Sequence, residues 1–269
     1  HTMYVTATPA PPIPKVEGKL KIAITAAPFI TVPPSHYGGA EIIIYDLAES
    51  LAKMGHDVTV FAADGSNVPG CKVVEYGPPV EKVKVNWAEA EKKAYDVYKD
   101  QLDEFDIIND HTWFGYPYLS KVKNPKLKII HTHHGHLNWK SKPPGIDKLN
   151  LVAISDFMVS VYKNQGFTSK RVYNGVNMER YPFKAEKGDR LLYVGRFSKF
   201  KQPHVAIEVA KRLDMEIDLL GGTFVDDKTY LNMVREMVVG YPKAKMYEDA
   251  PHEKKLELMQ NAKALIFGS

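Results

Sequence analysis

The sequence predicts an α/β fold in which parallel strands alternate with helices. Short apolar segments are followed repeatedly by a glycine-containing or polar loop and then by an amphipathic segment with helical spacing. Several of the apolar segments, such as residues 20–27, are apolar on both faces, as strands of a parallel sheet covered by helices require. Sheets of this kind bind ligands at the carboxyl ends of their strands, so functional residues are expected there.

The first strand–helix–strand unit lies near the start of the chain. Residues 20–27 predict a strand, a loop ends at Gly38 and Gly39, and residues 57–63 predict a second strand. The helix between them ends before Gly55 and has apolar residues at helical spacing, namely Ile43, Leu47, Leu51 and Met54. Together these segments predict a βαβ unit with a right-handed crossover.

The same alternation continues to about residue 177. The remaining strands are predicted at residues 71–76, 105–111, 127–136, 149–155 and 171–177. Ser155 is placed to cap the helix that follows it, and Asn174–Gly175 predicts a turn. A charged helix over residues 87–105 has aromatic and aliphatic residues at near-helical spacing, which favour core packing: Trp87, Tyr95, Tyr98 and Leu102.

A second α/β pattern begins after the polar segment 179–189, which resembles a linker. Strands are predicted at residues 191–195, 215–222, 244–248 and 264–267, with helices between them. We therefore expect a flexible tail over residues 1–18, a first domain over residues 19–184 and a second domain over residues 185–269. The second domain is shorter than the roughly 100–150 residues of an ordinary domain, so we expect it to be incomplete.

Composition excludes several classes of protein. The chain has 269 residues, of which 44% are hydrophobic and 25% charged, as in an ordinary globular protein. No apolar run reaches the roughly 20 residues of a membrane-spanning helix. The net charge of +4 is spread along the chain, so no nucleic-acid partner is expected. The single cysteine, Cys71, fits a reducing compartment, and the Pro-rich start lacks a signal-peptide pattern, so we expect a cytoplasmic protein.

Two cations follow a predicted strand and a glycine turn in the segment LLYVGRFSKFK, residues 191–201. Arg196 offers a planar fork of donors and Lys201 a point charge, a combination that suits a diphosphate at the carboxyl edge of a sheet. A solvated basic loop is the alternative interpretation. Gly221–Gly222 ends another predicted strand, where it either lets the backbone approach a nucleotide or simply terminates the strand.

A cluster of histidines, HTHHGH at residues 131–136, follows the strand predicted before it. Histidines gathered at a sheet edge are plausible zinc ligands, and the segment is similar to the HxHxDH signature of zinc-dependent hydrolases. Gly135 stands where that signature has aspartate, and the chain begins with a βαβ unit instead of the β-rich pattern of such hydrolases. A zinc hydrolase is therefore kept only as an alternative.

Several short motifs, in their order and spacing, resemble one enzyme family. They are GGAE at residues 38–41, NDHTWFG at 109–115, HTHHG at 131–135, RVYNGVNMERYPF at 171–183, YVGRFSKFKQPHVAIEVAKRL at 193–213 and NAKALIF at 261–267. The chain resembles retaining glycosyltransferases of family 4, in the group that includes glycogen synthases and mannosyltransferases. This resemblance implies the GT-B fold, with two Rossmann-like doubly wound domains, of which the second is incomplete here.

The resemblance also implies an activity. Such enzymes move a sugar from a nucleoside-diphosphate sugar, here a UDP- or GDP-sugar, to an acceptor. Arg196 and Lys201 resemble the family's diphosphate clamp, which would do the work of a metal, so no metal or cofactor is expected. THHG aligns with the family's T-x-H-G, which implies that His134 lies near the donor sugar, and His111 resembles the other histidine of that site.

Three glycines are further candidates for the donor site. Gly38 and Gly39 precede a helix, where backbone N–H groups can face a phosphate, although a plain turn is the alternative. Gly222 is the third. The chain departs from the family at Lys201–Gln202, where Lys-Gly is usual, and it ends before the family's glutamate pair. A non-catalytic protein that binds a nucleotide or sugar is therefore the main alternative, and the acceptor (a saccharide, a lipid or a small molecule) stays open.

Overall fold

The computed structural model describes residues 18–35, 38–80, 85–137, 139, 149–225 and 227–268. The chain divides into two compact units. The first comprises His1–Pro33 and Ala40–Val176, and the second comprises Pro34–Gly39 and Asn177–Ser269. The expected flexible tail falls almost wholly outside the described residues, and the domain boundary between residues 184 and 185 stays a prediction.

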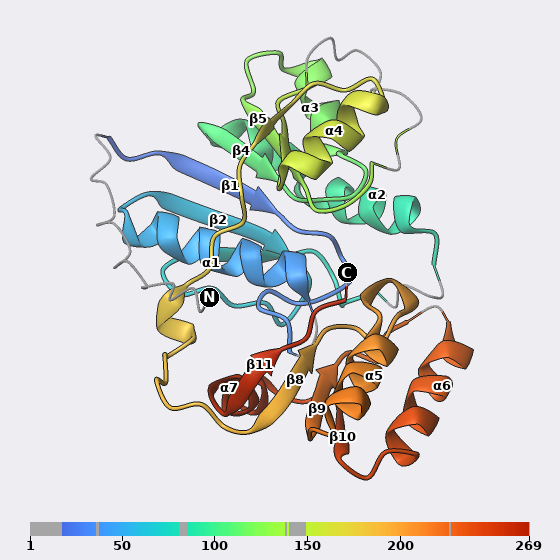
Figure 1. Cartoon of the computed structure of the whole chain (residues 1–269). Coiled ribbons are helices and arrows are strands. Elements are labelled where there is room, and N and C mark those ends of the chain that lie inside the picture. The colour runs from blue at the N-terminus through green and yellow to red at the C-terminus, as the bar shows by residue number, and fades with distance from the viewer. Residues whose placement is uncertain are drawn as a thin grey trace. The chain divides into compact units, whose positions relative to one another are not determined.

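The first unit is built on a seven-stranded sheet in which every pair of neighbouring strands is parallel (Figure 1). The strand order is β3-β2-β1-β4-β5-β6-β7, so the sheet grows in both directions from β1 as a doubly wound fold does. The strands are β1 (Lys21–Thr25), β2 (Asp57–Ala62), β3 (Lys72–Glu75), β4 (Ile107–Asp110), β5 (Ile129–His133), β6 (Leu151–Ala153) and β7 (Ser169–Arg171).

Helices cover both faces of this sheet. They are α1 (Gly39–Lys53), α2 (Trp87–Tyr98) with its 3₁₀ continuation η1 (Lys99–Glu104), α3 (Pro117–Lys123) and α4 (Asp156–Asn164). Alternate residues of β1 separate the two cores, because successive side chains of a strand point to opposite faces. Ile22 and Ile24 pack with Ile44 of α1, whereas Ala23 packs with Tyr98 of α2.

The helix predicted before Gly55 is confirmed as α1, and one other local prediction for this unit is wrong. The fully buried residues of α1 are Glu41, Ile44 and Ala48, while Leu47 and Leu51 of the predicted stripe are partly buried and pack against the same core. Residues 172–177 have no regular structure, so Asn174–Gly175 forms no turn. Asn-Gly turns are most favoured between two antiparallel strands of a hairpin, whereas β7 is the edge strand of a parallel sheet.

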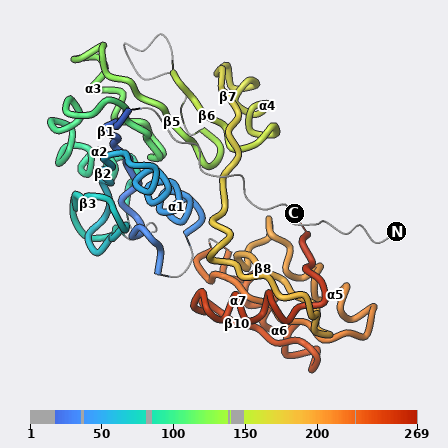
Figure 2. The backbone as a smooth tube through the Cα atoms, turned by 90° about the vertical axis from the view of Figure 1, so that its left-hand side faces the viewer, coloured from blue at the N-terminus to red at the C-terminus, as the bar shows by residue number. Residues whose placement is uncertain are grey.

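The second unit has a four-stranded parallel sheet in the order β10-β9-β8-β11, the orange and red part of Figure 2. Its strands are β8 (Arg190–Val194), β9 (Ile217–Gly221), β10 (Ala244–Glu248) and β11 (Ala262–Leu265). The helices are α5 (Pro203–Leu213), α6 (Lys228–Val239) and α7 (His252–Gln260), with short 3₁₀ turns η2 (Met178–Arg180) and η3 (Lys199–Lys201). These elements confirm the strands and helices predicted for the second α/β pattern.

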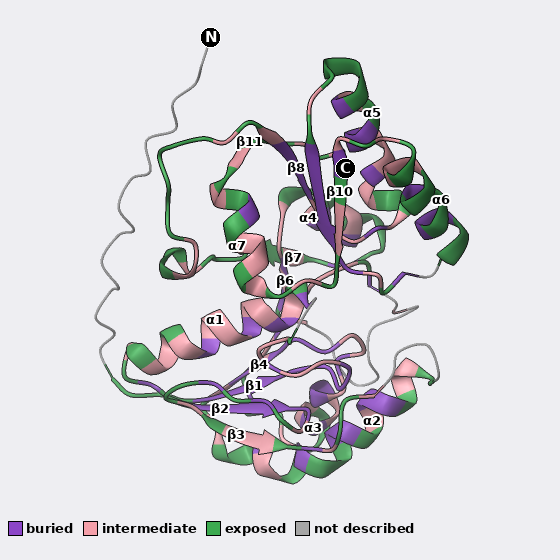
Figure 3. Ribbon diagram, turned by 90° about the horizontal axis from the view of Figure 1, so that it is seen from below, coloured by how far each residue is buried: buried purple, intermediate pink, exposed green. Residues whose placement is uncertain are grey.

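Burial follows the same layering in both units (Figure 3). The central strands β1, β2, β8 and β9 are almost entirely buried, and each long helix buries one face. Within the described ranges, no helix combines the length and the apolar character that crossing a bilayer demands.

Candidate functional site

The carboxyl ends of β4 and β5 bring the predicted histidines together. The two strands are parallel neighbours with Asp110 paired to His131, so the residues that follow each strand leave the sheet side by side. His111 follows β4, and His134 follows β5. The sheet register therefore explains why two motifs separated by about twenty residues form one cluster, as doubly wound folds predict.

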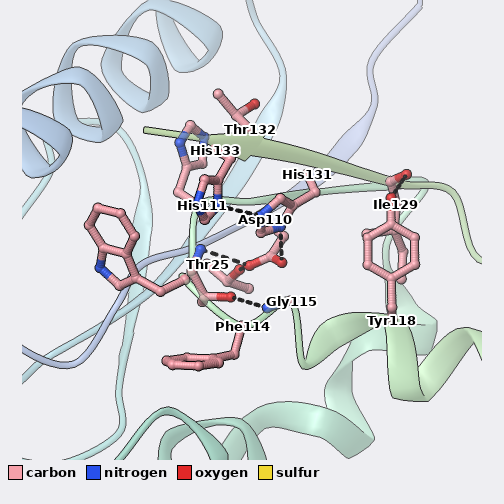
Figure 4. Close-up of polar contacts among 12 residues, drawn as sticks. Thr25, Asp110, His111, Phe114, Gly115, Tyr118, Ile129, His131, Thr132 and His133 are labelled. Atoms are coloured by element: carbon pink, nitrogen blue, oxygen red, sulfur yellow. Dashed lines mark hydrogen bonds and ion pairs between the residues drawn. The ribbon is translucent and has the colours of Figure 1, made fainter. Parts of the chain in front are cut away.

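Asp110 is the buried anchor of this cluster (Figure 4). Its Oδ1 atom accepts hydrogen bonds from the Thr25 hydroxyl at 2.7 Å and from the Thr112 N–H at 3.0 Å. Its Oδ2 atom lies 2.6 Å from His131 Nδ1. Burial alone would raise the pKa of Asp110, but the His131 ion pair and these hydrogen bonds hold that pKa below its ordinary value.

A chain of hydrogen bonds continues from Asp110 through two histidine rings. His133 Nε2 lies 3.1 Å from the carbonyl oxygen of His136, so Nε2 carries a proton and donates it. Burial lowers the pKa of His133 to about 3, so His133 is neutral and its Nδ1 accepts from His131 Nε2 at 3.0 Å. His131 thus links the Asp110 carboxyl, through Nδ1, to the His133 ring, through Nε2. Both the His131 and the His133 side chains are buried.

The two histidines predicted to act on substrate contact each other. His111 Nδ1 lies 2.8 Å from His134 Nε2, and the rings stack with centroids 5.1 Å apart. Burial, followed by the positive field of His131, lowers the pKa of His134 to about 4, and burial lowers the pKa of His111 well below its ordinary value. Both rings are therefore neutral at pH 7. Within the described part of the chain, no hydrogen-bond partner meets the buried Nε2 atom of His111.

The loop after His111 is held by side chains instead of by secondary structure. Glu91 of α2 accepts the Trp113 N–H at 2.8 Å through Oε1 and the Phe114 N–H at 2.9 Å through Oε2. Trp139 Nε1 donates to the carbonyl oxygen of Trp113 at 3.0 Å. Gly115 has a φ of +66°, and a Cβ there would lie 2.7 Å from the Trp139 ring, so only glycine fits this turn.

Sequence reasoning missed Glu91. It lies four residues after Trp87 and four before Tyr95, in the middle of the stripe that the helical spacing assigns to the core. Glu91 is 2% exposed, so the stripe is correct and one of its members is a carboxyl. A glutamate inside an apolar helical stripe could have identified this residue from the sequence, because a buried carboxyl must have hydrogen-bond partners nearby.

In the second unit, the glycine turn after β8 carries the predicted diphosphate residues. Arg196 follows Gly195, and the next residue, Phe197, donates its N–H to the carbonyl oxygen of Gly222 at 3.1 Å. Lys201 ends η3, and its ammonium lies 5.3 Å from the centre of the Phe267 ring. Thus Arg196 and Gly222 lie on adjacent loops at the carboxyl edge of β8 and β9, as the sequence predicts for a strand-end site.

The predicted site glycines differ in whether their surroundings require glycine. A Cβ at Gly221 would lie 1.8 Å from the Gly195 carbonyl oxygen, so close approach of the two loops requires glycine there. Gly38 is buried and Gly39 begins α1, where an added Cβ would meet nothing within 4 Å. The predicted position of Gly38 and Gly39 at a helix N-terminus is therefore confirmed, and their role in binding stays a prediction.

The zinc alternative finds no matching geometry. Among the residues with described positions, no group of three or more His, Cys, Asp or Glu side chains is placed to hold a metal ion. The ring nitrogens of His131 and His133 are instead engaged in the hydrogen-bond chain from Asp110 to the His136 carbonyl.

Comparison with known proteins places this arrangement in a family. Spore coat protein SA of Bacillus subtilis (strain 168) is 24% identical over 250 residues, which is 81% of this chain and 65% of that protein. O-antigen chain mannosyltransferase C of Escherichia coli is 24% identical over 226 residues, 71% of this chain and 59% of that protein. The chain thus spans about three fifths to two thirds of the length of these relatives.

A solved structure shares the fold. The crystal structure of Anabaena Alr3699/HepE in complex with UDP and glucose superposes with a TM-score of 0.64 at 15% identity, covering 93% of this chain and 74% of that one. The two parallel sheets described above are accordingly those of the GT-B fold. The model of Glycosyltransferase Family 4 matches residues 37–180, more than half of the chain, which replaces the zinc hydrolase alternative. This chain therefore belongs to glycosyltransferase family 4.

Proposed function

We propose that this protein transfers a sugar from a nucleoside-diphosphate sugar to an acceptor and retains the configuration at the anomeric carbon. The observation that carries the proposal is the neutral His111–His134 pair at the carboxyl edge of the first sheet, with one buried ring nitrogen facing no protein partner among the described residues. Membership of family 4 supports glycosyl transfer, and the UDP and glucose bound by a protein of the same fold support a UDP-sugar donor.

The chemistry assigns distinct work to the two sets of residues. A neutral imidazole at His134 or His111 can hydrogen-bond a sugar hydroxyl without adding charge. Arg196 and Lys201 stabilise the negative charge that develops on the departing diphosphate. The anomeric C–O bond to phosphate breaks, the bond to the acceptor oxygen forms, and the acceptor's proton passes to the diphosphate. On this mechanism the cations perform the task of a metal, so we propose that none is needed.

The glycines contribute through their backbone. Gly38 and Gly39 lie at the N-terminus of α1, where N–H groups can face a donor phosphate or the substrate. Gly222 lies on the loop that contacts the Arg196 segment, where the absence of a side chain leaves room for a nucleotide. The acceptor is left open, and a cytoplasmic location is part of the proposal.

Nucleotide binding gives the first test. A thermal-shift titration of the 269-residue chain with UDP, GDP and ADP in excess EDTA should raise the melting temperature with one nucleotide. A ligand at about 100 times its dissociation constant adds roughly 2.7 kcal/mol, equivalent to a few degrees. A shift in EDTA supports metal-free binding. No shift with any of the three, on protein that melts cooperatively, contradicts donor binding by this chain.

The diphosphate clamp is tested by Arg196→Ala. Removing the guanidinium should weaken binding of the preferred nucleoside diphosphate about tenfold or more in calorimetry, because a charge-assisted contact is lost. Arg212→Ala, which removes an exposed cation from α5 of the same unit, is the matched control and should leave the affinity unchanged. Equal affinities in both variants would reject the clamp.

The competing function is a non-catalytic protein that binds a nucleotide or sugar. Hydrolysis or transfer of sugar from UDP- and GDP-sugars, followed by product analysis, separates the two functions. Nucleotide binding without turnover of any donor would support the binding protein.

A further inference from the structure

The carboxyl of Glu91 is the most unusual buried group outside the histidine cluster. It is 2% exposed, and its two oxygens accept the backbone N–H groups of Trp113 and Phe114. Within the described residues, none of the ion pairs involves Glu91. A buried carboxyl with no cation is a costly means of satisfying two N–H groups, so what it holds in place is informative.

Glu91 holds the loop segment that follows His111. In this segment Thr112 donates its N–H to Asp110, and Gly115 donates its N–H to the Thr112 hydroxyl at 3.2 Å. The Trp113 and Phe114 N–H groups lie between those two attachments, and Glu91 is their acceptor. Figure 4 shows Phe114 and Gly115 on this loop beside the Asp110 cluster. The loop can therefore shift at its middle only if the contact to α2 is broken.

We propose that Glu91 is a positioning residue, which fixes the His111 ring against His134 by holding the loop after His111 through both carboxyl oxygens. This inference rests on the proposed function, because it assigns Glu91 to the site that His111 and His134 form. It differs from a purely structural role in predicting that the His111 ring, and not only the loop backbone, responds to the state of the Glu91 carboxyl.

The surroundings of Glu91 make its hydrogen bonds to the Trp113 and Phe114 N–H groups depend on pH. Burial raises the pKa of Glu91 to about 8, the two backbone N–H groups oppose that rise, and the negative charge of Asp110 adds to it. Among the residues that the structure describes, three phenols on α2 and on the loops after β3 and β4 also interact with Glu91 electrostatically: Tyr76, Tyr98 and Tyr116. Only the ionised carboxylate offers two full acceptors, so the loop is held by both oxygens above about pH 8.

The experiment is an NMR titration of the whole chain between pH 6 and 9.5, observing the Trp113 and Phe114 amides and the ring nitrogens of His111. In the wild type, all of these signals should shift with a common midpoint near pH 8. In Glu91→Gln the midpoint should vanish, because the amide presents one acceptor and one NH₂ group. The unpaired N–H of Trp113 or Phe114 should then exchange with solvent about tenfold faster.

Glu89→Gln is the matched control, since Glu89 is an exposed residue of the same helix and should leave every signal as in the wild type. Amides that titrate while the His111 ring does not would overturn positioning, and so would the absence of any midpoint near pH 8. The wild-type titration is decisive even if Glu91→Gln fails to fold. No step uses sugar transfer, so loss of the proposed activity and loss of this inference are read separately.

Discussion

At the scale of single residues, the Asp110–His131 pair determines the character of the site. The Asp110 carboxyl and the His131 ring are completely buried and lie 2.6 Å apart, and the field of His131 contributes to the low pKa of His134. Removing the Asp110 carboxyl leaves His131, Thr25 and the Thr112 N–H without their partner. The consequences are therefore larger than those of a surface ion pair.

We accordingly expect Asp110→Ala to lower the free energy of unfolding by about 3–5 kcal/mol, measured by urea denaturation. Asp156→Ala is the control, because Asp156 forms an ion pair with Arg171 on the surface, and its loss should leave the midpoint nearly unchanged. If the two variants lose equal stability, the buried pair does not have the importance that its geometry indicates.

The sequence predicted the residues of this site unevenly. His111 and His134 were identified because their motifs resemble a family, and strand register explains why they meet. Glu91 was not, since a charged residue at a core position of a helix is read as part of the solvated face unless its partners are known. The hydrogen-bond chain through His131 and His133 depends on side-chain rotation, which residue spacing does not determine.

At the scale of elements, the sequence predicted nearly all strands and helices. Buried strands appear as short continuous apolar runs, whereas amphipathic helices have apolar residues at every third or fourth position, so the two patterns can be told apart. Prediction from the sequence failed where tertiary context decided, as at Asn174–Gly175. The glycine pair at the end of β9 is a different case. The sequence left two interpretations of that pair open, and the approach of the Gly195 carbonyl explains the need for glycine at position 221.

Gly221→Ala should consequently destabilise the second unit. The added Cβ would lie 1.8 Å from a backbone oxygen, so the β8 and β9 loops must move apart at a cost of about 1–3 kcal/mol. Gly240→Ala, at the end of α6, meets its nearest atom at 3.4 Å and is the control for the same change in the same unit. Thermal denaturation of both variants checks the prediction, and equal melting temperatures would contradict it.

At the scale of the whole molecule, four buried groups give stability a defined dependence on pH. Burial lowers the pKa values of His111, His133 and His134, the last two to about 3 and about 4. Below pH 6.5 these histidines therefore bind protons in the unfolded chain but stay neutral in the folded chain. Their contribution is therefore present above pH 6.5 and is lost as the pH falls. Each such proton gives a slope of about 1.4 kcal/mol per pH unit.

Glu91 acts in the opposite sense. Its pKa rises from 4.5 to about 8, so its contribution is fully present below pH 4.5 and is lost as the pH rises through 8. Between pH 4.5 and 6.5 the three histidines outweigh the single carboxyl, and stability rises with pH. Between pH 6.5 and 8 only Glu91 among these four groups still differs between the folded and unfolded chain, and stability falls by about 1.4 kcal/mol per unit.

We therefore expect maximum stability near pH 6.5, measured by urea denaturation at half-unit intervals from pH 5 to 8.5. Glu91→Gln removes the only one of these groups that titrates on the alkaline side, so its stability should stay level between pH 6.5 and 8 while the acid side is unchanged. Glu89→Gln should reproduce the wild-type maximum. Wild-type stability that stays level from pH 6.5 to 8 would contradict the raised pKa of Glu91, because a carboxyl that is ionised in both the folded and the unfolded chain contributes no loss in that interval.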